Sequence, residues 1–124
     1  MAKQDSVAKA SNLSFDEFKK IVLSDFKLAN ESRQASLLGR KEVLTGKAKF
    51  GIFGDGKEVA QLAMAKVFKD GDFRSGYYRD QTFMMSIGAV NLQDWFAGLY
   101  GHADIGFEPM SGGRQMGGHF ATHS

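Results

Sequence analysis

The sequence predicts a mainly α-helical fold, and three observations support this. In long stretches of the chain, apolar residues recur every three or four positions, which places them on one face of a helix. Helix-capping residues precede these stretches and glycines follow them. Extended segments are too few to build a sheet of their own. We therefore expect four helices joined by glycine-containing connections.

Composition limits the class of protein. The chain has 124 residues, 43% of them hydrophobic, which fits a globular domain. Its net charge of +2 is too small to indicate a nucleic-acid or membrane partner. Because there is no cysteine, disulfides, thiolate zinc sites and a Cys nucleophile are excluded. The polar N-terminus shows no secretory signal and no run is long enough to span a bilayer, so we expect a cytoplasmic protein.

The first helix is expected after a flexible tail formed by residues 1–13. Ser14 and Glu17 have the spacing of a capping box. The pattern then continues to Gly39 or on into Val43-Leu44, although polar residues thin the apolar stripe in the second half. The spacing predicts one buried face, made of Phe15, Phe18, Val22, Phe26 and Ala29.

A second helix is expected after the glycine-rich connection 45–56. Asp55 is its predicted cap, with Glu58 at the third position after it. Gly71 is expected to adopt a left-handed conformation after its end. The helix is apolar over a wide arc and is predicted to be buried, and its alanines would let another helix approach closely. The residues concerned are Val59, Ala60, Leu62, Ala63, Met64, Val67 and Phe68.

Two shorter helices are expected in the second half of the chain. Asp80 can cap a helix from Gln81 to Gly88, and Asn91 can cap one from Leu92 to Tyr100. Gly101 should end the last helix, since glycine readily adopts the left-handed conformation that stops one. The glycines and the proline after Gly101 predict loop structure from there on.

The turn Ser75-Gly76-Tyr77-Tyr78-Arg79-Asp80 is the first candidate binding site. A guanidinium fork with adjacent phenols is a good receptor for a phosphate or diphosphate. We expect Asp80 to orient Arg79, and a helix N-terminus, which favours anions, follows directly. The alternative is a surface arginine and a half-buried tyrosine that only pack the turn.

The loop from Gly112 to His119 is the second candidate. It carries Arg114 and His119 between glycines, so it could fold over a ligand with backbone amides, a cation and a proton donor. The alternative is a tail made flexible by its glycines. His119 and His123 have the spacing of a helical metal pair, but the intervening glycines disfavour a helix and no third ligand is evident. We predict no metal site in this chain.

Gly54-Asp55-Gly56 matches neither of two known phosphate motifs. The Lys-Ser/Thr of a Walker loop is missing. The metal-diphosphate motif of thiamine-diphosphate enzymes needs an Asn about two dozen residues later, whereas the next Asn is Asn91.

Four short motifs stand in the order Gly56-Lys57-Glu58-Val59-Ala60, Gly71-Asp72, Tyr78-Arg79-Asp80 and Gly113-Arg114-Gln115-Met116, with His119 after the last. In this order they resemble the N-terminal part of the alpha subunit of thiamine-diphosphate-dependent 2-oxoacid dehydrogenases. The last of them, followed by a His, looks closest to the branched-chain type, and the whole looks most like chains in which alpha and beta parts are fused. The resemblance covers residues 14–124.

The resemblance implies roles for particular residues. Tyr78 and Arg79 would hydrogen-bond the diphosphate of thiamine diphosphate, His119 would lie near the cofactor and the acyl intermediate, and Arg114 would order the loop. In the family the magnesium motif lies further along the alpha sequence, and the activating glutamate comes from the beta part. The chain would then be the N-terminal, mainly helical piece of an α/β thiamine-diphosphate-binding fold, inactive alone.

The implied partners are a 2-oxoacid substrate, the beta part of the enzyme, a lipoyl-bearing acyltransferase and further copies in a homo- or hetero-oligomer. No helix or strand is predicted between the glycine-rich loop and Ser124, which is what we expect of a piece of a longer protein. Two other interpretations remain. One is a small, non-catalytic phosphate-binding module in which Arg79, Arg114, Arg40-Lys41, Lys47 and Lys49 converge. The other is a purely structural helical fragment.

Overall fold

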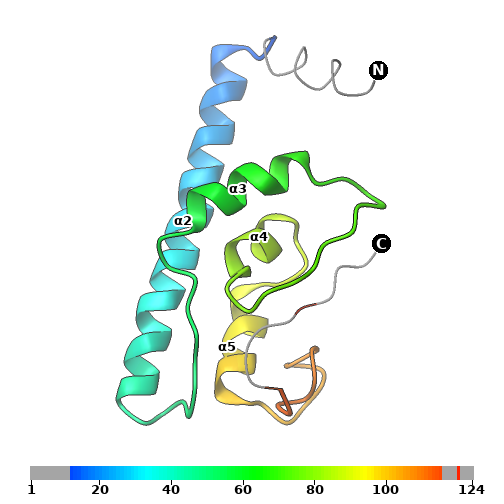
Figure 1. The fold of residues 1–124 in the computed structure, drawn as a ribbon. Coiled ribbons are helices and arrows are strands. Elements are labelled where there is room, and N and C mark those ends of the chain that lie inside the picture. The colour runs from blue at the N-terminus through cyan, green and yellow to red at the C-terminus, as the bar shows by residue number, and fades with distance from the viewer. Residues whose placement is uncertain (1–11, 116–119, 121–124) are drawn as a thin grey trace.

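The computed structural model describes residues 12–115 and residue 120. Its four helices are α2 (Phe15–Leu44), α3 (Glu58–Val67), α4 (Gln81–Ser86) and α5 (Leu92–Tyr100). They account for about half of the described residues, among which there is no strand. The prediction of a mainly helical chain is confirmed. Figure 1 shows α3, α4 and α5 gathered beside α2, whose N-terminal part rises above them.

The long helix α2 begins at the predicted capping box. The Ser14 hydroxyl accepts a hydrogen bond from the Glu17 N–H (3.3 Å), and the Ser14 N–H donates to the Glu17 carboxylate (2.9 Å). The helix continues without a break to Leu44, the longer of the two predicted ends. Its 30 residues correspond to about 45 Å at 1.5 Å per residue, so α2 is much longer than any element beside it.

The prediction that the apolar stripe of α2 is buried is wrong. Phe15, Phe18, Val22 and Phe26 are all exposed, and Ala29 is only partly buried. The buried residues of α2 belong instead to its second half, and they are Ser32, Ala35, Ser36 and Gly39. The physical reason is position: α4 and α5 meet α2 at Ser32, Ser36 and Gly39, where small side chains allow a close approach. The helix α3 reaches further toward the N-terminus of α2, where Lys66 pairs with Asp25 at the surface.

Hydrogen bonds join this small-residue half of α2 to α4. The Ser32 and Thr82 hydroxyls are 2.6 Å apart, and both are buried. The Gln81 Nε2 group donates to the Ser32 carbonyl (3.0 Å) and to the Ser36 hydroxyl (2.8 Å). Ser32 and Ser36, two of the polar residues that thin the stripe, are therefore contact residues of the interface, since a buried polar group is stable where it finds a partner.

The apolar core lies between α2, α4, α5 and the end of the described chain. Gly39 lets α2 come close to it, because a Cβ atom there would lie 2.6 Å from Phe53 Cε1 and 2.8 Å from Trp95 Cη2. Aromatic pairs fill the space, with Phe68 edge-on to Phe83 at 5.2 Å between centroids. The buried core residues are Ala35, Phe83, Met84, Val90, Trp95 and Phe120.

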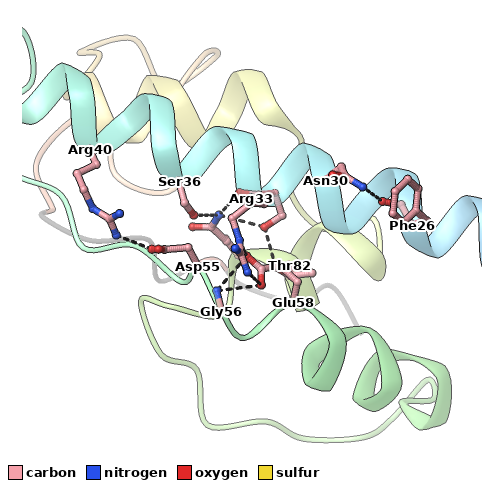
Figure 2. A network of polar contacts seen from close by, with 11 residues as sticks. Phe26, Asn30, Arg33, Ser36, Arg40, Asp55, Gly56, Glu58 and Thr82 are labelled. Atoms are coloured by element: carbon pink, nitrogen blue, oxygen red, sulfur yellow. Dashed lines mark hydrogen bonds and ion pairs between the residues drawn. The ribbon is translucent and has the colours of Figure 1, made fainter.

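The helix α3 starts later than predicted, and its expected cap has another role. Lys57 occupies the N-cap position, and no side chain caps the helix. Asp55 forms an ion pair with Arg40 of α2 (2.6 Å). Glu58 accepts two hydrogen bonds from Arg33 (2.7 and 2.9 Å) and one from the Gly56 N–H (2.9 Å). Figure 2 shows both acids turned toward α2, so they fasten α3 to the long helix.

The prediction that α3 is buried over a wide arc is also wrong. Only Leu62 among the predicted apolar residues is fully buried, and Phe68 is partly buried. One side of α3 packs on α2 and α4, and the opposite side remains open among the described residues. The exposed members of the predicted set are Val59, Ala60, Ala63, Met64 and Val67. Gly71 has the predicted positive φ (+88°).

The last two helices agree closely with the sequence pattern. The capping box of α5 is formed by Asn91 and Asp94, and Gly101 ends the helix with a φ of +65°. For α4 the start at Gln81 is confirmed, but the helix ends at Ser86 rather than at Gly88. Asp80 stands at its N-cap position without a side-chain cap bond, because its carboxylate is engaged elsewhere in the turn.

Candidate functional site

A cavity of about 330 Å³ lies between the connection 47–53, the helix α5 and the loop that follows it. Aromatic and aliphatic side chains supply most of its wall, two lysines contribute positive charge, and four glycines bring backbone close to it. A cavity of this size and lining has the character of a small-molecule site. The lining side chains are Lys47, Lys49, Phe50, Ile52, Phe53, Tyr78, Trp95, Leu99, Tyr100, Met110, Gln115 and Phe120, and the glycines are Gly51, Gly98, Gly101 and Gly113.

Tyr78 connects the predicted anion clamp to this cavity. Its ring packs on that of Tyr77 with 3.9 Å between centroids, and the Tyr77 hydroxyl donates a hydrogen bond to the Tyr78 hydroxyl. That bond raises the pKa of Tyr77 above the ordinary value of a phenol. The Arg79 guanidinium carbon lies 5.8 Å from the centre of the Tyr78 ring, within the range of a cation–π contact. Tyr78 lines the cavity wall, but Arg79 does not.

The expected pairing of Asp80 with Arg79 is wrong. The Asp80 carboxylate accepts hydrogen bonds from Arg74 Nη1 (3.1 Å) and from the Tyr77 N–H (2.9 Å). Arg79 Nε is buried and has no hydrogen-bond partner among the described residues. A buried donor without a partner is unfavourable, although Arg79 itself lies beside Tyr78 and not on the cavity wall.

The backbone at Arg79 is held by two contacts that the sequence did not reveal. Its carbonyl accepts a hydrogen bond from Gln61 Nε2 of α3 (2.9 Å). Gly54 lies so close that a Cβ atom there would be 2.5 Å from the same oxygen. Gln61 Oε1 in turn accepts from the Phe83 N–H of α4 (3.0 Å). The buried amide of Gln61 thus fixes the turn relative to two helices.

The glycine-rich loop is organised around Glu108, which sequence reasoning missed. The Glu108 carboxylate is fully buried and accepts from the N–H groups of Gly113 (2.9 Å), Ser111 (2.8 Å) and Met110 (3.2 Å), and from the Ser111 hydroxyl (3.0 Å). Burial raises the pKa of Glu108, but these donors outweigh it, so the pKa lies below its usual value. The available signal was an acidic residue between two glycines of this segment, Gly106 and Gly112.

The other predicted loop residues are placed as follows. Arg114 is exposed and does not line the cavity, and its N–H donates to the Ser111 hydroxyl (3.0 Å). His119 lies outside the described residues. Phe120 is buried on the cavity wall, and its carbonyl accepts from Arg74 Nη2 (2.6 Å). Arg74 therefore holds the turn and the end of the loop together, a role that the sequence pattern did not indicate.

The predicted basic residues come together only in part. Lys47 and Lys49 line the cavity, and Lys47 also lies 3.6 Å from the Glu42 carboxylate. Arg40 of α2 is bound to Asp55 of the following connection and does not line the cavity. The structure thus brings together Tyr78, the two lysines and the loop backbone at Gly113, and leaves the guanidinium of Arg114 outside.

Within the described part of the chain, no group of three or more His, Cys, Asp or Glu side chains could hold a metal ion. In the same residues, no helix is both long and apolar enough to cross a membrane.

Comparison of the chain with protein-family models, with curated protein sequences and with solved structures finds no match in any of the three.

Proposed function

We propose that this chain is the N-terminal part of the alpha subunit, or of a fused alpha-beta chain, of a thiamine-diphosphate-dependent 2-oxoacid dehydrogenase. Such an enzyme decarboxylates a 2-oxoacid and transfers the acyl group to a lipoyl carrier on an acyltransferase. One observation carries most of the support: Tyr78 and Gly113, from motifs far apart in the chain, line one cavity. Both motifs are those that the family resemblance associates with the cofactor.

The residues of this site fit the diphosphate end of the cofactor. Arg79 Nε is a buried donor without a partner in the described chain, and Lys47 and Lys49 add positive charge at the cavity. Charge-assisted hydrogen bonds of this kind are among the stronger polar contacts in proteins. The described residues do not fit magnesium, so we propose that its ligands come from another part of the enzyme.

The division of labour follows from this fit. The thiazolium of the bound cofactor supplies the electron sink for decarboxylation, and the protein must position it and provide charge. In the proposal, Tyr78 and Arg79 hold the diphosphate, the Glu108-centred loop forms one wall, and Arg114 orders that loop. His119 would serve beside the acyl intermediate. The beta part of the enzyme would provide the activating glutamate.

Calorimetric titration tests the clamp on the complete enzyme, with alpha and beta parts present. Thiamine diphosphate and magnesium are titrated into the parent enzyme and into its Arg79→Ala variant. Loss of charge-assisted bonds should weaken binding by about 10- to 100-fold, from roughly 1.5–3 kcal/mol. Arg40→Ala is the matched control, since Arg40 bonds Asp55 outside the cavity. Equal affinity of the Arg79→Ala enzyme would remove Arg79 from the site.

A second measurement concerns the isolated 124-residue chain. With neither the magnesium ligands nor the glutamate, it should neither bind the cofactor tightly nor release carbon dioxide from a 2-oxoacid. Detectable turnover by the purified chain would contradict this.

A non-catalytic anion-binding module is the second candidate, and one observation favours it. Lys47, Lys49 and Tyr78 share a cavity inside this chain alone. This candidate predicts that the isolated chain binds inorganic diphosphate, and that replacing both lysines with alanine abolishes binding. Diphosphate binding by the chain, together with a complete protein that lacks decarboxylase activity, would favour the module over the enzyme.

A further inference from the structure

The cavity of the candidate site has an apolar end and a positively charged end. Its most buried wall residues are Trp95 and Phe120, each 8% exposed. Lys47 and Lys49 also line it, and both are exposed. A ligand in this cavity therefore meets apolar side chains where water is excluded and ammonium groups where water has access, a combination typical of small-molecule sites.

The buried part of the wall suits an aromatic ring. The rings of Phe53 and Trp95 lie 6.0 Å apart between centroids and are tilted by 54°, and Tyr78 adds a third ring to the wall. Aromatic rings pack favourably edge-on or offset, with centroids roughly 4.5–7 Å apart. An apolar cavity of roughly 150 Å³ holds a benzene molecule, so the cavity of about 330 Å³ accommodates one ring with a short side chain.

The charges at the open end leave one positive charge without a counterion. Lys47 lies 3.6 Å from the Glu42 carboxylate, which also accepts a hydrogen bond from the Tyr100 hydroxyl (2.8 Å). Glu42 thus offsets the charge of Lys47. Lys49 forms no ion pair with any residue that the structure describes. One unbalanced cation complements a singly charged ligand better than a diphosphate, which carries several charges.

We propose that this cavity binds aromatic monocarboxylates, with the ring beside Trp95 and the carboxylate at the Lys49 ammonium group. This goes beyond the proposed function and does not depend on it, because it concerns what the chain binds by itself. Part of the wall is fixed before a ligand arrives, since the Gly113 N–H donates to the buried Glu108 carboxylate (2.9 Å). A preformed wall loses little conformational entropy on binding, which favours a small ligand.

Quenching of Trp95 fluorescence by para-bromophenylacetate tests this site in the 124-residue chain. Trp95 is the only tryptophan, and a bromine atom quenches tryptophan efficiently only near contact. The acid should quench saturably, with a Kd in the millimolar range or below, as expected for a molecule of this size. Its uncharged isostere, para-bromophenylacetamide, should bind about 5-fold more weakly. Absence of saturable quenching by the acid, or equal affinities of acid and amide, overturns the proposal.

Three single-charge variants test the roles assigned to the charged groups. Lys49→Gln should weaken binding of the acid by about 5-fold and leave binding of the amide unchanged. Glu42→Gln, which removes the negative charge beside Lys47, should strengthen binding of the acid by a similar factor. Lys57→Gln is the control, because Lys57 is exposed and does not line the cavity. Equal effects of Lys49→Gln and Lys57→Gln would show that Lys49 does not bind the carboxylate.

Competition identifies the anion. Phenylacetate, which lacks the bromine, should displace the quencher and restore the fluorescence of Trp95. Inorganic diphosphate at the same concentration should not, because it has no apolar body to fill the cavity. Displacement by diphosphate as efficient as that by phenylacetate would overturn the assignment to monocarboxylates and favour the anion-binding module. The titration of the complete enzyme with thiamine diphosphate does not affect this result, so the two proposals can fail separately.

Discussion

The two halves of α2 belong to one continuous helix but use opposite kinds of residue. The N-terminal half carries exposed phenylalanines, whereas the C-terminal half presents one buried face, made of Ser32, Ala35, Ser36 and Gly39. Burial therefore follows the position of the neighbouring helices and not the hydrophobicity of the stripe. Small residues let α4 and α5 approach, and the hydroxyls find partners there. Small, polar helix faces can be packing faces where the facing helix supplies hydrogen bonds.

The largest difference in unfolding free energy between the two halves is expected when leucine replaces a serine. Ser36→Leu should destabilise the fold by about 3 kcal/mol, from overpacking and from the lost bond to Gln81. Ser24→Leu, on the exposed half, should change stability by less than about 0.5 kcal/mol. Urea unfolding followed by circular dichroism measures both. Equal effects would show that the two halves are packed alike.

The next effect concerns the ion pair that anchors α3. Arg33→Ala should destabilise the fold, because it leaves the Glu58 carboxylate, only 6% exposed, without its two hydrogen bonds from Arg33. Lys27→Ala, which removes an exposed charge on the other half, should be close to neutral.

The Arg33 effect should depend on pH in a definite direction. The hydrogen bond from Arg33 lowers the pKa of Glu58 in the folded chain. Because the pKa of the Glu58 carboxyl is lower in the folded than in the unfolded chain, its ionised form stabilises the fold at pH values above the unfolded pKa of about 4.3. This stabilisation is lost as the pH falls through the folded pKa. The difference between wild type and Arg33→Ala should thus be largest near neutral pH and shrink in acid. A pH-independent difference in unfolding free energy would contradict this.

A smaller effect is expected from a single methyl group. Gly39→Ala should destabilise by about 1 kcal/mol, since overpacking against Phe53 and Trp95 exceeds the gain in helix propensity. Gly98→Ala in α5 is the matched control, because its nearest atom is a Glu108 oxygen at 3.9 Å. With space for the methyl, it should stabilise by up to about 1 kcal/mol. Thermal unfolding of the two variants, with shifts of opposite sign, checks the close approach at Gly39.

The smallest global effect is expected at the start of α2. Ser14→Ala removes the capping box, which is worth about 1 kcal/mol to a helix. Because the described N-terminal half of α2 has few contacts with the other helices, its first turns should fray without unfolding the rest. Amide hydrogen exchange should accelerate between residues 15 and 22, and remain unchanged beyond residue 32. Faster exchange throughout α2 would show instead that its halves unfold together.

Much of the fold could be predicted from local sequence. The capping boxes at Ser14 and Asn91 and the glycine stop at Gly101 act within one turn of helix, so their patterns are sufficient. Asp55 and Glu58 have the same spacing, yet both bind arginines of α2. A long-range partner overrode the local signal there, and periodicity alone could not reveal it.

The candidate site shows the same limit. Tyr78 was found from its motif, and the structure places it on a cavity wall. Gln61, Arg74 and Glu108 were missed because each acts through contacts with distant segments or with backbone N–H groups. Such roles depend on tertiary geometry, which residue type and spacing do not specify.

The backbone N–H of Phe83, a buried core residue, is linked to the turn at Arg79 through the side chain of Gln61. This N–H, near the start of α4, donates to the Gln61 side chain, and the same side chain donates to the Arg79 carbonyl. A ligand that displaces Arg79 therefore also changes the hydrogen bond between Gln61 of α3 and Phe83 of α4. The chemical shift and the hydrogen-exchange rate of the Phe83 N–H, measured by NMR, therefore report whether a ligand is bound at the turn, without a probe attached to the turn itself.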